Sequence, residues 1–267
     1  MNLKEHPKLK HPFKSLISER EVPLALIEHL KSLPETTGPS ISLKQAMKTH
    51  PNPLVISSDG KAYGYTPLKV NGKTYYLAEP DPIVLNYNIA YEIWKSLRSS
   101  KPKQFEKLAD QVPLEDTRSL LYGYFGRAMT FTTSLFTAVE ASLNRAIPKD
   151  YVNIKADTRN TVSRNKQQLM EFITFKDKLT ILKEAIGKSY TTDHPLIYHR
   201  ILKLKELRDL TIHPKDGDDD LAKYPDLYKQ LFKIDFPETL LAVKSFVNYH
   251  AGSEIIRDCT CGKTEND

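Results

Sequence analysis

The longest apolar stretch of the chain, residues 120–147, is the feature that most constrains its fold. It is interrupted by Arg127, Glu140 and Arg145, so it does not offer the roughly 20 continuous apolar residues that a membrane-spanning helix requires. A helical pattern begins near residue 115, and Pro148, which cannot continue a helix, ends it. We therefore expect one long helix that is buried in the protein core.

The composition is typical of a soluble globular protein. The chain has 267 residues, of which 40% are hydrophobic and 27% are charged, enough for one large domain or two small ones. The basic N-terminal segment lacks the apolar core and cleavage site of a secretory signal. Cys259 and Cys261 could ligate a metal or bridge to another chain, but their polar terminal segment favours free thiols. We expect a cytoplasmic protein without membrane, metal or cofactor.

The net charge is +6 and the sequence pI is about 9.0, which permits a polyanionic partner without requiring one. The histidines show no spacing that is typical of a metal site, because His194 and His199 are five residues apart without a carboxylate cluster. Any function in nucleic-acid chemistry must therefore be argued from particular residues.

Residues 53–80 differ in character from the rest of the chain. Short β-prone runs are separated there by Asp59-Gly60 and Asn71-Gly72, which are strong signals for hairpin turns. We expect three or four short antiparallel strands. Before them, residues 16–32 and 42–48 have the pattern of short helices.

Everything after Asp81 has a helical pattern. Residues 149–172 are the exception, because they are polar and poorly periodic. The expected fold class is mainly α: a helical bundle with a small N-terminal antiparallel β-hairpin region. We expect an N-terminal region over residues 1–112 that packs on the bundle, the bundle over residues 113–252, and a polar tail over residues 253–267. The expected helices are 82–99, 103–111, 115–147, 175–186, 194–213, 221–232 and 237–249.

Two charged residues lie beside the apolar stripes of their helices. Arg208 lies next to a stripe that runs through residues 197, 201, 204 and 207, and Glu140 lies next to one that runs through residues 136, 139, 143 and 147. Asn144 follows Glu140 by about one turn. An unpaired charge at the edge of a core is costly, so we expect Arg208 and Glu140 to lie close together.

Arg208 is followed five residues later by His213, which precedes Pro214 and therefore lies at or just beyond a helix end. On an ideal helix the two side chains would point about 140° apart, and an unwound last turn would bring them together. Arginine stabilises phosphate charge and histidine transfers protons near neutral pH, so the pair suits phosphodiester cleavage. Alternatively, Arg208 forms a structural salt bridge and His213 caps the helix. Spacing alone favours this second interpretation.

The segment from Arg208 to His213, Arg-Asp-Leu-Thr-Ile-His, resembles the R-x4-H signature of HEPN domains, which are named after nucleotide-binding proteins of higher eukaryotes and prokaryotes. The surroundings are similar too: a long preceding helix that contains residues 136–144, then Pro148, then a helix that contains residues 178–182. The resemblance covers about residues 115–250, and it does not account for the hairpin region.

The resemblance implies a metal-independent endoribonuclease that acts as a homodimer, with two motifs facing each other across a cleft. His213 would act as general base or acid on the RNA 2′-hydroxyl or the leaving oxygen. Arg208 would stabilise the scissile phosphate, and Glu140 or Asn144 would orient Arg208. Asp209 would form a local hydrogen bond or repel RNA. A role as a toxin or in defence, with an antitoxin or regulatory protein as partner, follows from the resemblance alone.

Further RNA contacts are expected from Arg159, Arg164 and Lys166, in a basic segment that also holds an aromatic residue and amides, and from Lys215. Solvated side chains would have the same composition. Two other functions remain open. One is a non-catalytic HEPN-like scaffold that binds RNA, a nucleotide or a protein, and the other is recognition by the N-terminal hairpin region.

Overall fold

The computed structural model describes residues 19–20, 54–56, 62–78, 80–109, 114–156, 161–213, 224–252 and 254–256. The chain divides into two compact units, one of residues 10–82 and one that contains residues 83–267, and each is described by itself. The helix expected over residues 42–48 lies outside the described residues. So does most of the one expected over residues 16–32, whose two described residues instead form a strand.

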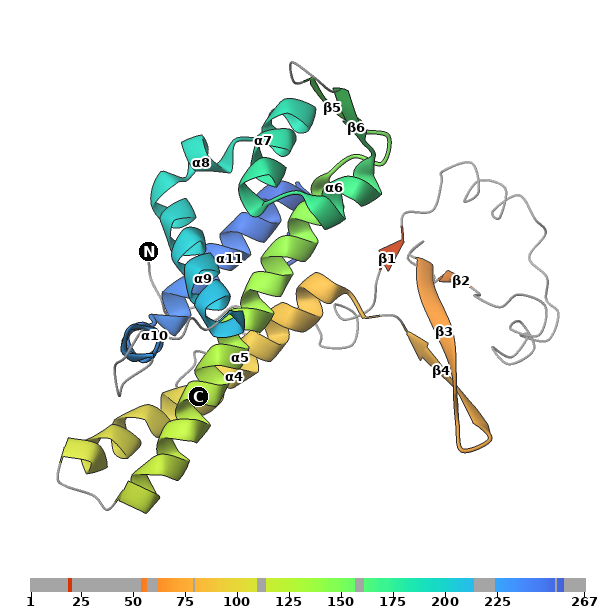
Figure 1. The fold of residues 1–267 in the computed structure, drawn as a ribbon. Helices are drawn as coiled ribbons and strands as arrows, with labels where there is room; N and C mark the ends of the chain where they lie inside the picture. The colour runs from red at the N-terminus through yellow and green to blue at the C-terminus, as the bar shows by residue number, and fades with distance from the viewer. Residues whose placement is uncertain are drawn as a thin grey trace. The chain divides into compact units, whose positions relative to one another are not determined.

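The N-terminal unit contains an antiparallel sheet. Its strands are β1 (Glu19–Arg20), β2 (Leu54–Ile56), β3 (Ala62–Val70) and β4 (Lys73–Ala78). The order is β1-β3-β2, and β4 also pairs with β3 (Figure 1). Asn71 and Gly72 connect β3 to β4 with φ angles of 48° and 76°, the left-handed conformation that the twist of a tight hairpin favours. The predicted antiparallel hairpin region is confirmed, although the β-prone runs within residues 62–70 form one strand.

The second unit is a helical bundle, and the prediction of a mainly α protein is confirmed. Its helix α5 runs beside α9, α11, α7 and α10. Among the described residues, no helix combines the length and apolar character needed to cross a membrane. The helices are α4 (Pro82–Ala109), α5 (Leu114–Ala146), α6 (Lys166–Phe172), α7 (Phe175–Ile186), α8 (Tyr190–Asp193), α9 (Pro195–Ile212), α10 (Pro225–Phe232) and α11 (Phe236–Ala251).

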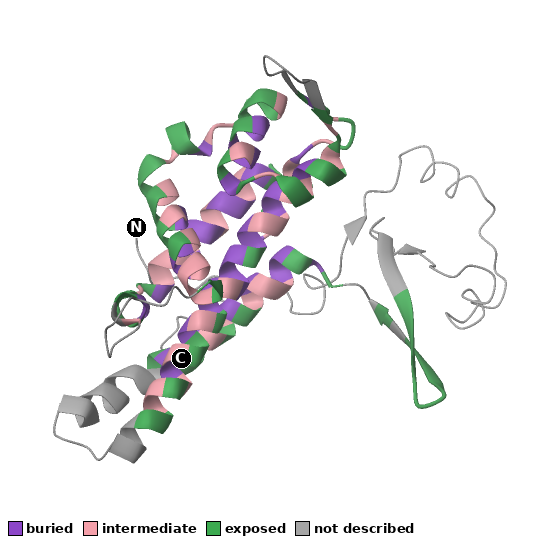
Figure 2. Ribbon diagram, in the orientation of Figure 1, coloured by how far each residue is buried: buried purple, intermediate pink, exposed green. Residues whose placement is uncertain are grey.

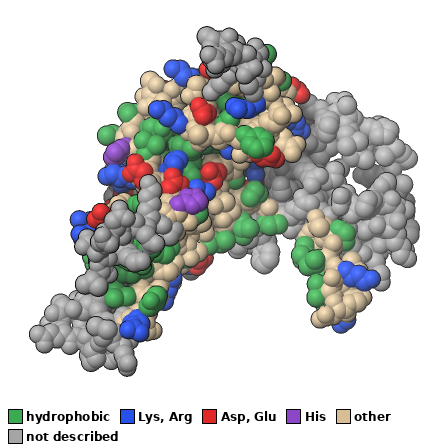
Figure 3. All heavy atoms as spheres, in the orientation of Figure 1, with side chains coloured by type: hydrophobic (Ala, Val, Ile, Leu, Met, Phe, Trp, Pro, Cys, Tyr) green, Lys and Arg blue, Asp and Glu red, His purple; other side chains and the backbone are tan. Residues whose placement is uncertain are grey.

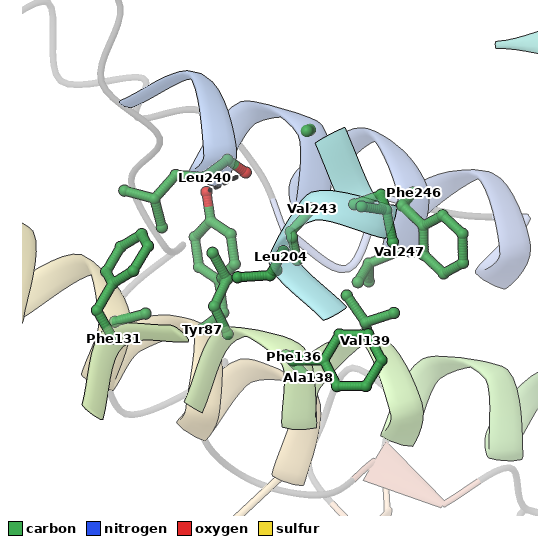
Figure 4. Packing of buried hydrophobic residues seen from close by; sticks show 14 of the residues in the cluster. Tyr87, Phe131, Phe136, Ala138, Val139, Leu204, Leu240, Val243, Phe246 and Val247 are labelled. Carbon is green, nitrogen blue, oxygen red and sulfur yellow. Dashed lines mark hydrogen bonds between the residues drawn. The ribbon is translucent and has the colours of Figure 1, made fainter. Parts of the chain in front are cut away.

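Helix α5 is the buried helix that the sequence predicted. Phe131, Phe136 and Val139 on its inward face are at most 1% exposed. They lie with residues of α9 and α11 in one continuous apolar core (Figures 2 and 4). The expected stripe of α9 is buried as well, at residues 201, 204 and 207. The core therefore fixes which faces of α5 and α9 remain at its edge.

Helix α4 belongs to the bundle. The hydroxyl of its buried Tyr87 donates a hydrogen bond to the backbone oxygen of Leu240 in α11 at 3.3 Å. The boundary between the compact units accordingly falls between residues 82 and 83, earlier than the expected boundary after residue 112. The two helices expected over residues 82–99 and 103–111 form one helix.

Between residues 149 and 193 the structure agrees with some local predictions and differs from others. Helix α7 has the expected bounds of residues 175–186, and Gly187 ends it in the left-handed conformation, with φ of 69°. Residues 190–193 form the short helix α8 directly before α9. Residues 149–172, expected to lack regular structure, contain the hairpin of β5 (Asn153–Ala156) and β6 (Thr161–Arg164), followed by α6. Ile154 of β5 is 66% exposed, so this hairpin lacks the inward apolar pattern that would have revealed it.

Candidate functional site

Arg208 and Glu140 form the predicted ion pair. Arg208 lies on α9 and its Nη2 is 3.5 Å from Oε2 of Glu140 on α5. The guanidinium also lies over the ring of Phe136, 5.5 Å from the ring centre, one helical turn before Glu140. The side chains of Arg208 and Glu140 are 26% and 37% exposed, so the pair lies at the edge of the core and within reach of solvent.

Asp209 is a second carboxylate partner of Arg208. Its Oδ1 accepts a hydrogen bond from Nη1 of Arg208 at 3.1 Å, and its Oδ2 accepts one from Nζ of Lys205, one turn earlier on α9. Burial raises the pKa of Asp209, but these hydrogen bonds and the two positive charges outweigh it and lower the pKa overall. The predicted local hydrogen bonding of Asp209 is confirmed. Arg208 is thus held by carboxylates on both sides.

Asn144 contacts Lys178, a residue that the sequence reasoning missed. Nζ of Lys178 on α7 donates to Oδ1 of Asn144 at 2.8 Å and to the backbone oxygen of Met170 at 2.9 Å. Lys178 is 6% exposed, and this burial lowers its pKa, although the nearby charge of Glu140 raises it. Of the two residues expected to orient Arg208, only Glu140 pairs with it. The signal available in the sequence was the position of Lys178 on the apolar face of its helix, together with Phe175 and Leu182.

His213 caps the C-terminal end of α9. Its backbone N–H donates to the oxygen of Asp209 at 2.9 Å, which keeps the last turn α-helical. The unwinding that would bring His213 towards Arg208 therefore does not occur within α9. The side chain of His213 is exposed. The helix thus presents an anchored guanidinium and, beyond its last turn, an exposed imidazole.

The site carries more positive than negative charge. Three cations from α7 and α9 stand against two carboxylates from α5 and α9. On the face of the molecule shown in Figure 3, acidic and basic side chains lie intermixed over α5 and α9, with a histidine beside them. The cations are Lys178, Lys205 and Arg208, and the carboxylates are Glu140 and Asp209.

Of the four residues expected to contact RNA, Arg164 and Lys166 lie in the described part of the chain. Lys166 donates to the backbone oxygens of Arg145 and Ile147, so it caps the C-terminal end of α5. Burial and the charge of Lys149 lower its pKa. Arg164 is the last residue of β6 and is partly exposed. Lys166 therefore has a structural role, while RNA binding by both residues stays a prediction. Arg159 and Lys215 lie outside the described residues.

Within the described part of the chain, no three His, Cys, Asp or Glu side chains are grouped as metal ligands would be. Cys259 and Cys261 lie outside that part. Comparisons with protein-family models, with curated proteins and with solved structures found no match. The function must therefore be argued from the site itself.

Proposed function

We propose that this protein is a HEPN-like, metal-independent endoribonuclease whose site is built on Arg208 and His213. The observation that supports it is the anchoring of Arg208 by Glu140 and Phe136 on α5, while His213 is exposed at the end of the same helix. A guanidinium that Glu140 and Phe136 already hold in place can stabilise the charge of a phosphoryl transition state after losing only its contact with Asp209. Within the same proposal, two copies form the cleft, and the cellular role is that of a toxin or a defence factor.

The chemistry needs one base, one acid and a charge stabiliser. The imidazole of His213 takes the proton of the RNA 2′-hydroxyl, and the oxygen then attacks the adjacent phosphorus. The bond from phosphorus to the 5′-oxygen breaks, and this oxygen takes a proton from the His213 of the second copy. The products are a 2′,3′-cyclic phosphate and a 5′-hydroxyl. Arg208 stabilises the negative charge on the phosphoryl oxygens.

The pairing of Arg208 with Asp209 is compatible with this role because Asp209 has another partner. When Nη1 of Arg208 turns to a phosphate oxygen, Lys205 still neutralises the Asp209 carboxylate. Glu140 meanwhile continues to hold the opposite side of the guanidinium. RNA binding therefore breaks one of the two carboxylate contacts of Arg208 and leaves no carboxylate without a cation.

A second candidate function is a non-catalytic scaffold that binds RNA, a nucleotide or a protein. One observation favours it: the charge of Arg208 is already balanced by two carboxylates, as in a purely structural ion pair. The two candidates differ in their need for His213. Catalysis requires the imidazole, whereas a scaffold tolerates its loss.

The test compares RNA cleavage by three proteins in the presence of EDTA: the wild type, His213→Ala and the matched control His199→Ala. His199 is also an exposed histidine of α9. We expect wild type and His199→Ala to cleave a mixed-sequence RNA and His213→Ala to lose activity by at least about a hundredfold, the contribution of a general acid–base group. Equal cleavage by all three proteins, or cleavage by none, would contradict the catalytic proposal and favour the scaffold.

A further inference from the structure

The contact between Lys178 and Asn144 fixes the orientation of the Asn144 amide. An ammonium group has three donors and no acceptor, so the atom of Asn144 that it contacts at 2.8 Å must be the oxygen. Lys178 is itself held in place, because it is buried and donates also to the backbone oxygen of Met170. The amide nitrogen Nδ2 of Asn144 consequently points away from Lys178. In the part of the chain that the structure describes, this nitrogen makes no hydrogen bond.

Asn144 lies on the same face of α5 as the anchor of Arg208. Glu140 and Asn144 are four residues apart, and residues at this spacing are neighbours on a helix surface. Glu140 pairs with Arg208 at 3.5 Å, and its charge also acts on the buried ammonium of Lys178. Asn144 is only partly buried, so solvent or a ligand can reach this face. The amide of Asn144 therefore lies on the same face of α5 as Glu140, one turn further along the helix.

We propose that Asn144 binds RNA through Nδ2, and that Lys178 is the positioning residue that holds the amide in the required orientation. This inference rests on the proposed ribonuclease function. The ligand of Nδ2 is a non-bridging oxygen of an RNA phosphate, because asparagine amides commonly donate to phosphate oxygens. Asn144 thus has a role of its own at the substrate, separate from the orientation of Arg208 by Glu140.

The decisive variant is Asn144→Asp. Aspartate keeps an oxygen for Lys178 and adds a negative charge next to its ammonium, but it removes both N–H donors. The matched control is Asn88→Asp, which adds the same charge at a partly exposed position of α4 outside the site. We expect Asn144→Asp to melt at or above the wild-type temperature while its kcat/KM for RNA falls by about tenfold or more, as expected for a lost hydrogen bond to a charged group. Asn88→Asp should keep the wild-type kcat/KM.

The positioning role of Lys178 has its own test. Lys178→Met keeps an unbranched side chain, one heavy atom shorter, and removes the ammonium, which frees the Asn144 amide to turn. We expect Lys178→Met to lower kcat/KM in the wild-type background but to cause no further loss in an Asn144→Ala background, at equal concentrations of folded protein. Losses that multiply would show that Lys178 acts independently of Asn144 and would contradict the positioning role.

The outcomes separate this inference from the function on which it rests. A wild-type protein that cleaves no RNA would contradict the proposed function and, with it, the role of Asn144. An active wild type together with an equally active Asn144→Asp would contradict only the role of Asn144. A large loss of thermal stability in Asn144→Asp would contradict the premise that Lys178 holds the amide oxygen.

Discussion

Acidification should destabilise the helical unit through His250, a buried histidine near the end of α11. His250 is 4% exposed, and its Nδ1 hydrogen-bonds to the backbone oxygen of Phe246 at 2.9 Å. Its Nε2 is buried and makes no hydrogen bond with the described residues. The rings of Tyr190 and Tyr249 pack against it. Burial lowers the pKa of His250 to about 4, the Phe246 oxygen opposes this shift, and the charge of Lys188 adds to it.

The sign of the effect follows from the folded pKa being lower than the unfolded one. The unfolded chain binds a proton with a pKa of about 6.5, whereas the folded protein resists protonation of His250 until about pH 4. The stability that this neutral histidine permits is therefore complete above pH 6.5 and is lost as the pH falls towards 4. Preferential protonation of His250 in the unfolded chain lowers the free energy of unfolding by about 3 kcal/mol over this interval, of which about 2 kcal/mol is lost between pH 7 and pH 5.

The assay is urea denaturation at pH 7 and pH 5 for the wild type, His250→Phe and His199→Gln. Phenylalanine suits the aromatic surroundings and cannot titrate, while His199→Gln removes an exposed histidine of α9 as a control. We expect the free energy of unfolding of the wild type and of His199→Gln to fall between these pH values by about 2 kcal/mol more than that of His250→Phe. The same pH dependence in wild type and His250→Phe would refute the reasoning.

Three further predictions follow from the site and the bundle. Arg208→Met should lower the free energy of unfolding by about 1 kcal/mol in urea titrations, because the Glu140 carboxylate left behind is 37% exposed; a loss of several kcal/mol would mean that it is buried. Asp209→Asn should tighten RNA binding in fluorescence titrations, because Arg208 loses a competing carboxylate; weaker binding would contradict this competition. Gly187→Ala should cost about 1 kcal/mol in urea titrations, because φ of 69° strains any residue with a Cβ, whereas unchanged stability would contradict the strain.

The helical core and one contact of the site could be predicted from the sequence. Residues beside an apolar stripe must lie at the edge of the core, and a charge there needs a partner of opposite sign. The sequence therefore predicts the pairing of Arg208 with Glu140 without any information on how α5 packs against α9.

The remaining contacts depend on tertiary packing. The position of α7 against α5 brings Lys178 to Asn144, and no pattern within either helix specifies that position. The hairpin of β5 and β6 is exposed, so it lacks the apolar alternation that identifies strands. The Pro102 position of α4 lies inside a helix, although proline favours a break there. The expected break divided residues 82–111 into two helices, whereas the structure has one helix whose buried residues belong to the bundle core.

The most direct test of the ribonuclease chemistry uses a short RNA that the wild-type protein cleaves at a defined bond. The same RNA is prepared with a deoxyribose on the 5′ side of that bond, and the masses of the fragments are measured in the presence of EDTA. The proposal predicts a 2′,3′-cyclic phosphate and a 5′-hydroxyl from the unmodified RNA, and no cleavage at the deoxyribose. Cleavage at the deoxyribose would contradict attack by the 2′-hydroxyl. So would fragments that lack cyclic phosphate ends even at the earliest time points of the reaction.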